Sequence, residues 1–161
     1  MVRLQKSTPI MVVGSIGYNL GAGIQYALLA EFKNIISIEL SDKYYEYCKN
    51  KYEKFNNIKI IKGDSGLCLW VAIKEINEPI TFWLDAHFCG GDTAHGIRKV
   101  PLEMELEQIN RHPIKTHTFL IDDVRNLKLE KSMEIIKEIN KDYKFTYADG
   151  YIPNDVLVCK T

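Results

Sequence analysis

Apolar and polar positions alternate along this chain in blocks that predict strands and helices in turn. The first apolar run starts at Ile10, breaks into a loop that contains Gly17, Gly21 and Gly23, and then resumes with helical spacing. This pattern predicts a strand, a glycine turn and a helix. Glycine adopts backbone angles that other residues avoid, and the N–H groups at a helix start favour polar or anionic ligands. The stretch is therefore a candidate ligand-binding loop. Glycine turns also occur where nothing binds, so the pattern alone does not decide the matter.

Four more apolar runs predict strands over residues 35–40, 58–62, 80–85 and 117–123. Between the strands, apolar residues recur at the spacing of helices. They are Ile24, Leu28 and Leu29 in the first helix, Tyr44, Cys48, Tyr52 and Phe55 in the second, Leu67, Trp70, Val71 and Ile76 in the third, Leu102, Leu106 and Ile109 in the fourth, and Leu129, Met133, Ile136 and Ile139 in the fifth. In the fourth helix, we expect Glu103, Glu105 and Glu107 to face solvent.

The last two apolar segments, 143–147 and 156–159, flank the turn DGYIPND and predict a closing hairpin. Strands that alternate with helices predict an α/β protein. The expected fold is a three-layer Rossmann-like arrangement, in which a mostly parallel seven-stranded sheet ends in an antiparallel hairpin. Because 161 residues is the length of one ordinary domain, residues 1–161 are expected to form a single domain.

Composition bears on the partners of the protein, on membrane segments and on disulfide bonds. Lys plus Arg and Asp plus Glu both number 21, so net charge gives no argument for nucleic acid or a membrane surface as partner. The charge-free stretch 7–30 is interrupted by Pro9 and by glycines, which argues against a membrane span or a signal peptide. The four cysteines lie far apart without a CxxC pair, so a disulfide framework is not expected and a reducing cytoplasm fits best.

A glycine turn or an acid follows each of the predicted parallel strands. In chain order these residues are Gly17, Glu39, Asp64, Asp85 and the pair Asp122 and Asp123. In parallel sheets, ligands bind outside the carboxyl ends of the strands. We therefore expect these residues to line a ligand site, although a single acid after a strand is often only a helix cap.

Two of the acids indicate an adenosine ligand. Glu39 lies 18 residues after Gly21, about the separation at which an acid binds the ribose hydroxyls in nucleotide-binding α/β units. Asp64, which Ser65 follows, is placed to accept a hydrogen bond from an adenine amino group.

A short-chain dehydrogenase that uses NAD is the weaker interpretation of the same glycine loop. Such an enzyme needs a Tyr-x-x-x-Lys pair late in the chain. Here Tyr45 with Lys49 and Tyr47 with Lys51 match the spacing, but they lie on the helix after the second strand. A solvated helix face explains them more simply.

The segments SIGYNLGAG, SIELS, IKGDS, TFWLDAHF and FLIDDVR, in this order, resemble the class I S-adenosylmethionine (SAM)-dependent methyltransferases over nearly the whole chain. The resemblance implies the methyltransferase form of the Rossmann-like fold and SAM as cofactor. It implies cofactor contacts from Ser15, Gly17, Gly21, Glu39, Leu40, Asp64, Ser65 and Asp85. Within the superfamily, LDAH and IDD resemble the metal-dependent sugar O-methyltransferases of the macrocin O-methyltransferase type, which implies that Asp85, Asp122 and Asp123 bind Mg²⁺.

His87 matches the position at which the resembled enzymes carry an acidic base. A neutral imidazole can accept a proton near pH 7, so His87 is the candidate catalytic base, and a loop or capping histidine is the plain alternative. The surrounding segment 87–99 has three glycines and predicts a long loop. His87, Cys89 and His95 could also be zinc ligands, but three ligands on one glycine loop are a weak signal.

At one position the chain departs from the resembled family. Ser15 stands where that family carries an acid, which helps to hold the methionine end of the cofactor. Two function classes therefore stay open: a methyltransferase that acts on a hydroxyl of a polar small molecule such as a sugar or glycan, and a degenerate methyltransferase fold that serves as a binding or scaffold module. Loop 88–99 or a second subunit of a homo-oligomer would have to close the site.

Overall fold

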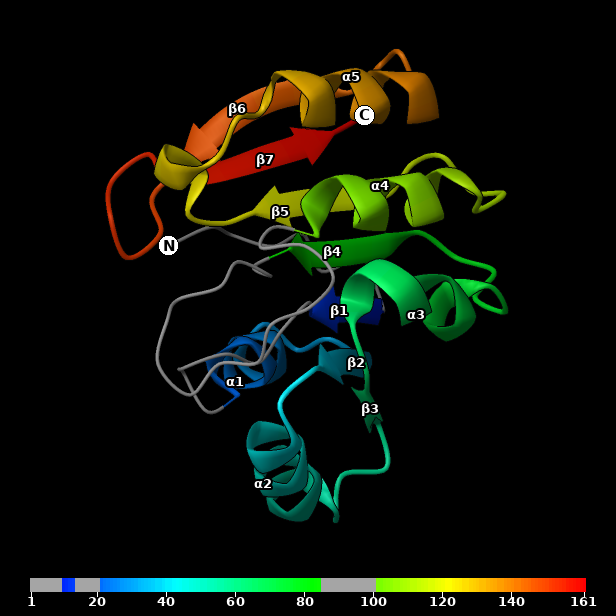
Figure 1. The fold of residues 1–161 in the computed structure, drawn as a ribbon, viewed down its shortest axis with the longest axis vertical. Helices are drawn as coiled ribbons and strands as arrows, with labels where there is room; N and C mark the ends of the chain where they lie inside the picture. The colour runs from blue at the N-terminus through cyan, green and yellow to red at the C-terminus, as the bar shows by residue number, and fades with distance from the viewer. Residues whose placement is uncertain (1–9, 14–20, 85–100) are drawn as a thin grey trace.

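The computed structural model describes residues 10–13, 21–84 and 101–161, the first four through their backbone (Figure 1). The first half of the chain forms β1 (Ile10–Val13), α1 (Ala22–Leu29), β2 (Asn34–Glu39), α2 (Asp42–Tyr52), β3 (Ile58–Lys62), α3 (Ser65–Ile73) and β4 (Ile80–Leu84). The second half forms α4 (Leu102–Asn110), β5 (Thr118–Ile121), a short 3₁₀ turn η1 (Val124–Asn126), α5 (Glu130–Ile139), β6 (Lys144–Ala148) and β7 (Val156–Lys160).

The described strands form one seven-stranded sheet in the order β3-β2-β1-β4-β5-β7-β6. Figure 1 shows this order from β3 at the bottom to β6 at the top. The pairs from β3 to β5 are parallel, whereas β7 is antiparallel to both β5 and β6. The predicted α/β sheet with a closing antiparallel hairpin is confirmed. Because the strand order reverses between β1 and β4, the carboxyl ends there form the crevice in which such folds bind ligands.

Helices cover both faces of the sheet, which makes the three layers. On one face, α3, α4 and α5 pack on strand residues such as Phe82, Phe119 and Leu157, all fully buried. On the other face, α1 and α2 pack on β2 and β3 through a smaller cluster that includes Ile24, Ile35 and Cys48. These apolar layers hold the strands in register, and their burial is the main stabilising contribution to the fold. None of the helices in the described ranges is both long enough and apolar enough to cross a lipid bilayer.

Helix α3 presents a different face to the sheet than its apolar spacing predicted. Leu67 and Val71 are 56% and 68% exposed, whereas Leu69 and Ile73 are buried together with Gly66. The sequence SGLCLWVAI is apolar almost all round, so hydrophobic period alone does not select a face. Contact with α4 selects it, because a Cβ on Gly66 would lie only 3.3 Å from Pro101.

Two further expectations are corrected. Glu105 on α4 was expected to face solvent, yet it is 1% exposed, because it follows Pro101 by one helical turn on the side that meets α3. The fifth strand ends at Ile121 rather than at Asp123, since Asp123 has a positive φ of 56°, which a strand cannot contain. Asp122 and Asp123 therefore lie in the turn beyond β5.

Candidate active site

The glycine turn before α1 is supported by α2. Gly21 has a φ of 85°, and a Cβ at this residue would lie 3.1 Å from Sγ of Cys48 and 3.3 Å from the ring of Tyr52. The Tyr52 hydroxyl also approaches the Gly21 carbonyl oxygen at 3.4 Å. Both the backbone angle and the close packing therefore call for glycine here. Ser15 and Gly17, the other two predicted cofactor residues of this turn, lie outside the described residues.

Glu39 is the last residue of β2 and lies at the carboxyl edge, as predicted. Its side chain is 2% exposed, and its Oε1 accepts a hydrogen bond from the backbone N–H of Ser41 at 2.6 Å. The backbone N–H of Gly63 donates to the carbonyl oxygen of Glu39 at 3.0 Å. The ends of β2 and β3 are thus joined, and Glu39 and Asp64 stand at neighbouring strand ends.

Leu40 follows Glu39 and is partly buried. Its carbonyl oxygen accepts a hydrogen bond from Nζ of Lys62 on β3, and the same Nζ lies 3.0 Å from Oδ1 of Asp42. Lys62 therefore ties the turn after β2 to β3, which fixes the backbone beside Glu39.

Asp64 caps α3, since its Oδ1 accepts from the backbone N–H of Gly66 at 2.9 Å. The capping alternative is thus realised for Asp64, and it uses one of the two carboxylate oxygens. Ser65, also a predicted cofactor residue, is the first residue of α3 and is buried. The turn predicted to meet adenine is therefore a rigid helix start.

Gln108 on α4 holds this helix start, and the sequence analysis missed it. Its Oε1 accepts from the backbone N–H of Trp70 at 2.7 Å, and its Nε2 donates to the carbonyl oxygens of Gly66 at 2.5 Å and Ser65 at 3.2 Å. The Gln108 side chain thus bonds two residues of α3 that lie one helical turn apart, Gly66 and Trp70. In the sequence, Gln108 follows three glutamates of the same helix, and nothing in that pattern predicts that it contacts α3.

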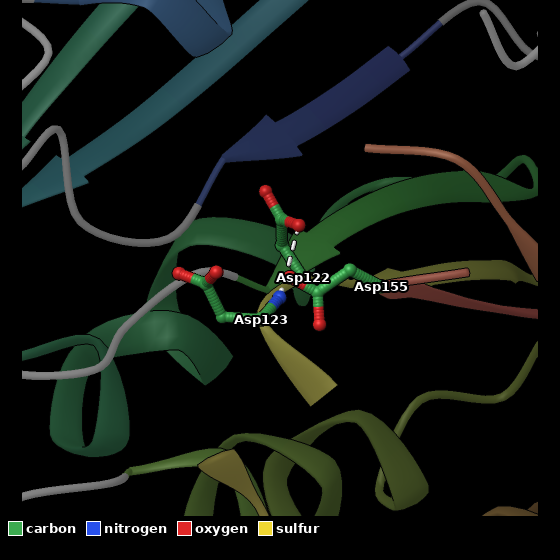
Figure 2. A group of neighbouring side chains, drawn as sticks. All are labelled: Asp122, Asp123 and Asp155. Carbon is green, nitrogen blue, oxygen red and sulfur yellow. Dashed lines mark hydrogen bonds between the residues drawn. The ribbon is translucent and has the colours of Figure 1, made fainter. Parts of the chain in front are cut away.

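Three carboxylates meet at the carboxyl edge beyond β5 (Figure 2). Asp122, Asp123 and Asp155 each offer an oxygen, and these three oxygens lie within 4.8 Å of one another. The structure therefore brings together two of the predicted metal residues and adds Asp155, which the sequence analysis missed. Asp155 comes just before β7, the antiparallel neighbour of β5, so only the strand order places it here.

Arg125 lies in the same turn and makes ion pairs with two of the three acids. Its NH1 is 2.5 Å from Oδ1 of Asp123 and also pairs with Oδ2 of Asp155. The backbone N–H of Arg125 donates to Oδ1 of Asp155 at 3.1 Å, and that of Asp123 donates to Oδ1 of Asp122 at 2.9 Å. The cluster therefore already contains a positive charge from the chain itself.

The hairpin turn after β6 closes on this cluster. A Cβ on Gly150 would lie 3.3 Å from Oδ1 of Asp122, and Tyr151 beside it is fully exposed. The turn thus forms one wall of the acid cluster.

The described cysteines are not poised as nucleophiles. Burial raises the pKa of Cys48 to about 11 and that of Cys159 to about 12, and it also raises the pKa of Cys68. All three are free thiols, and a thiol reacts as its thiolate. We conclude that these three cysteines are structural.

The dehydrogenase interpretation gains no support from α2. Lys49 lies over the ring of Tyr45, and Lys51 lies over that of Tyr47, each with Nζ 5.5 Å from the ring centroid. These are cation–π contacts between α2 residues that lie outside its buried set, Tyr44, Cys48 and Tyr52.

Several predicted residues remain to be placed. Asp85 and His87 lie outside the described residues, as do Cys89 and His95, so the catalytic base, the first metal acid and the zinc alternative all stay predictions.

Solved structures share this fold. TYW2 from M. jannaschii in complex with AdoMet matches with a TM-score of 0.61 at 16% identity, over 98% of this chain and 69% of that one. A protein of Streptococcus mutans, assigned as a methyltransferase and solved with SAH, matches with a TM-score of 0.60 at 13% identity, over 96% of this chain and 89% of that one. A candidate caffeoyl-CoA O-methyltransferase from Staphylococcus aureus matches with a TM-score of 0.60 at 12% identity, over 96% and 76%.

No protein-family model and no curated protein matches the sequence. At these identities the structural similarity defines the fold, which is that of the class I SAM-dependent methyltransferases. The fold predicted from the sequence is supported, whereas the methyltransferase activity and the finer grouping with macrocin-type enzymes stay predictions.

Proposed function

We propose that this protein is a SAM-dependent methyltransferase that methylates a hydroxyl of a sugar or another polar small molecule. The observation that carries the proposal is the position of Glu39 and Asp64 at neighbouring strand ends, at the carboxyl edge of a sheet whose strand order reverses between β1 and β4. This arrangement supplies acceptors for an adenosine where such folds bind one.

The carboxylate acceptors at these strand ends fit the adenosine half of SAM. The carboxylate of Glu39 suits two vicinal ribose hydroxyls, because each of its oxygens accepts hydrogen bonds. The carboxylate of Asp64 caps α3 through Oδ1 at the same strand end, and a carboxylate accepts the kind of hydrogen bond that an adenine amino group donates. SAM supplies an activated methyl group on a sulfonium. The chain's own task is to orient the acceptor and to take up its hydroxyl proton.

Asp122 and Asp123, together with Asp85, are proposed to hold Mg²⁺. Carboxylate oxygens are the ligands that Mg²⁺ prefers, and the oxygens that Asp122 and Asp123 offer lie, with one of Asp155, within 4.8 Å of one another. A bound Mg²⁺ lowers the pKa of a hydroxyl that it contacts. His87 is proposed to take the hydroxyl proton, since a neutral imidazole accepts protons near pH 7.

Calorimetric titration with SAH tests the proposal. We expect saturable binding, and we expect Glu39→Gln to weaken it about tenfold or more, because the amide loses the charge while its oxygen still accepts from Ser41. Glu46→Gln, an exposed site on α2, is the matched control and should bind as the parent does. Absence of binding at millimolar SAH would refute the proposal.

The metal part has its own test. The double change Asp122→Asn and Asp123→Asn should abolish methyl transfer and leave SAH binding largely intact, because neither residue belongs to the adenosine site. Equal transfer rates with and without excess EDTA would contradict a role for Mg²⁺.

Ser15 favours a second candidate function, a degenerate methyltransferase fold that binds a ligand or a protein without transferring a methyl group. Under this alternative, restoring the acid with Ser15→Glu should raise a low turnover or create one. If turnover is already measurable and Ser15→Glu leaves it unaffected, the alternative is abandoned.

We further propose a cytoplasmic location, small-molecule rather than nucleic-acid or membrane partners, and a homo-oligomer as the means of closing the site. The balanced charge of the chain supports the choice of partners.

A further inference from the structure

The acid cluster beyond β5 carries its own cation. The guanidinium of Arg125 is held between Asp123 and Asp155, and the Asp155 side chain is only 4% exposed. A guanidinium is a cation with several N–H donors, so one arginine can pair with two carboxylates at once. Arg125 places its positive charge against Asp123 and Asp155 through NH1.

Backbone hydrogen bonds to Asp155 also hold the turn that carries Arg125. Oδ1 of Asp155 accepts from the Arg125 N–H at 3.1 Å, and the Asp155 carbonyl oxygen accepts from the Val124 N–H at 3.2 Å. Asp155 thus binds the turn after β5 through its main chain and its side chain together. The left-handed backbone of Asp123, with a φ of 56°, is stabilised by this anchoring.

We infer that Arg125 is the resident cation of the cluster and competes with a divalent cation for Asp123 and Asp155. The Arg125 side chain is 44% exposed, and the Asp155 side chain that it pairs with is 4% exposed. A metal ion that shares these carboxylates meets the repulsion of the adjacent guanidinium, so it binds more weakly unless Arg125 moves away. In this arrangement Asp155 is the anchor that keeps Arg125 in place. The inference concerns the metal part of the proposed function and does not require methyl transfer.

Titration of the full chain with Mn²⁺ alone tests the competition, with binding followed by calorimetry or by the EPR signal of the free ion. Arg125→Gln removes the charge and should raise the affinity for Mn²⁺ about tenfold or more relative to the parent. Lys128→Gln removes an exposed positive charge three residues away and should leave the affinity within about twofold because, among the described residues, Arg125 and not Lys128 forms the ion pairs with Asp123 and Asp155. An Arg125→Gln protein that binds Mn²⁺ no tighter than the parent overturns the inference.

A second measurement needs no substitution and remains decisive if Arg125→Gln does not fold. In ¹⁵N-labelled parent protein titrated with Mg²⁺, the Nε–Hε resonance of Arg125 should shift in step with metal binding, because the guanidinium loses its carboxylate partners. Metal binding at Asp122 and Asp123 that leaves this resonance unchanged overturns the inference. Neither measurement involves SAM, so a failure here is distinct from a failure to bind SAH.

Discussion

Nδ1 of His117 accepts a hydrogen bond from the backbone N–H of Ile80 at 3.1 Å, which joins the start of β5 to the start of β4. An accepting Nδ1 carries no proton, so the neutral ring holds its proton on Nε2. That atom is buried and has no hydrogen-bond partner in the described part of the chain. The imidazole thus lies at the amino-terminal edge of the sheet, opposite to the candidate site. Its hydrogen bond and its burial both favour the neutral form.

The stability of the protein should fall as the pH is lowered from 6.5 toward 3. The pKa of His117 is lowered from 6.5 to about 3, first by burial and then by the charges of His112 and Lys115. Between these values the unfolded chain takes up a proton that the folded chain does not. The stability that the neutral ring provides is therefore complete above pH 6.5, and it declines by up to about 1.4 kcal/mol per pH unit below it.

Urea unfolding at several pH values between 7 and 4 measures this slope. His117→Asn keeps an acceptor near Ile80 and removes the titrating group, so the free energy of unfolding of the variant should depend less on pH. Carboxylates titrate in both proteins, and the difference between the two slopes isolates His117. Identical slopes would contradict the assignment.

Gln108 should matter for stability and for the cofactor site together. Gln108→Leu removes the partner of the Trp70 N–H and of the Gly66 carbonyl oxygen, which should cost about 2 kcal/mol because the bond to Gly66 is buried and the bond to Trp70 is partly buried. The helix start that carries Asp64 should loosen, and SAH affinity should fall. Urea unfolding and calorimetry measure the two effects.

Gln108→Glu distinguishes the role of the accepting Oε1 from that of the donating Nε2. A carboxylate still accepts from the Trp70 N–H but cannot donate to the Gly66 carbonyl oxygen. Glu107→Gln on the exposed side of α4 is the control and should be neutral. If Gln108→Leu leaves both stability and SAH affinity at the level of this control, Gln108 does not position the site.

Gly21→Ala should destabilise the protein by about 1–3 kcal/mol, because alanine is strained at positive φ and its methyl group would press on Cys48. A double-mutant cycle with Cys48→Ala measures the steric share, since the smaller side chain relieves the clash but not the backbone strain. A Gly21→Ala protein with unchanged melting temperature would contradict the described turn.

The site residues that could be predicted from the sequence are those whose positions depend on the local apolar pattern. Glu39 and Asp64 could be placed because each directly follows an apolar strand, and parallel strands bring their carboxyl ends to one edge. Asp155 could not be placed in this way, since its partner Arg125 is 30 residues away and meets it only through the antiparallel pairing of β5 with β7. Gln108 could not be predicted for the same reason. It lies 42 residues from Gly66 in the sequence, and the two residues meet only when α3 packs against α4.

Helix α3 also shows that tertiary packing, rather than local pattern, selects the buried face. The same substitution at two of its leucines should therefore have very different costs. Leu69 is 1% exposed and packs in the main core, whereas Leu67 in the same helix is 56% exposed. Leu69→Ala should cost about 2–5 kcal/mol through lost burial and a cavity. Leu67→Ala should change the free energy of unfolding by less than about 0.5 kcal/mol. The two substitutions have the same intrinsic helix propensity, so their difference in urea unfolding reports burial alone. Equal costs would mean that α3 is rotated toward the face that its apolar spacing predicts.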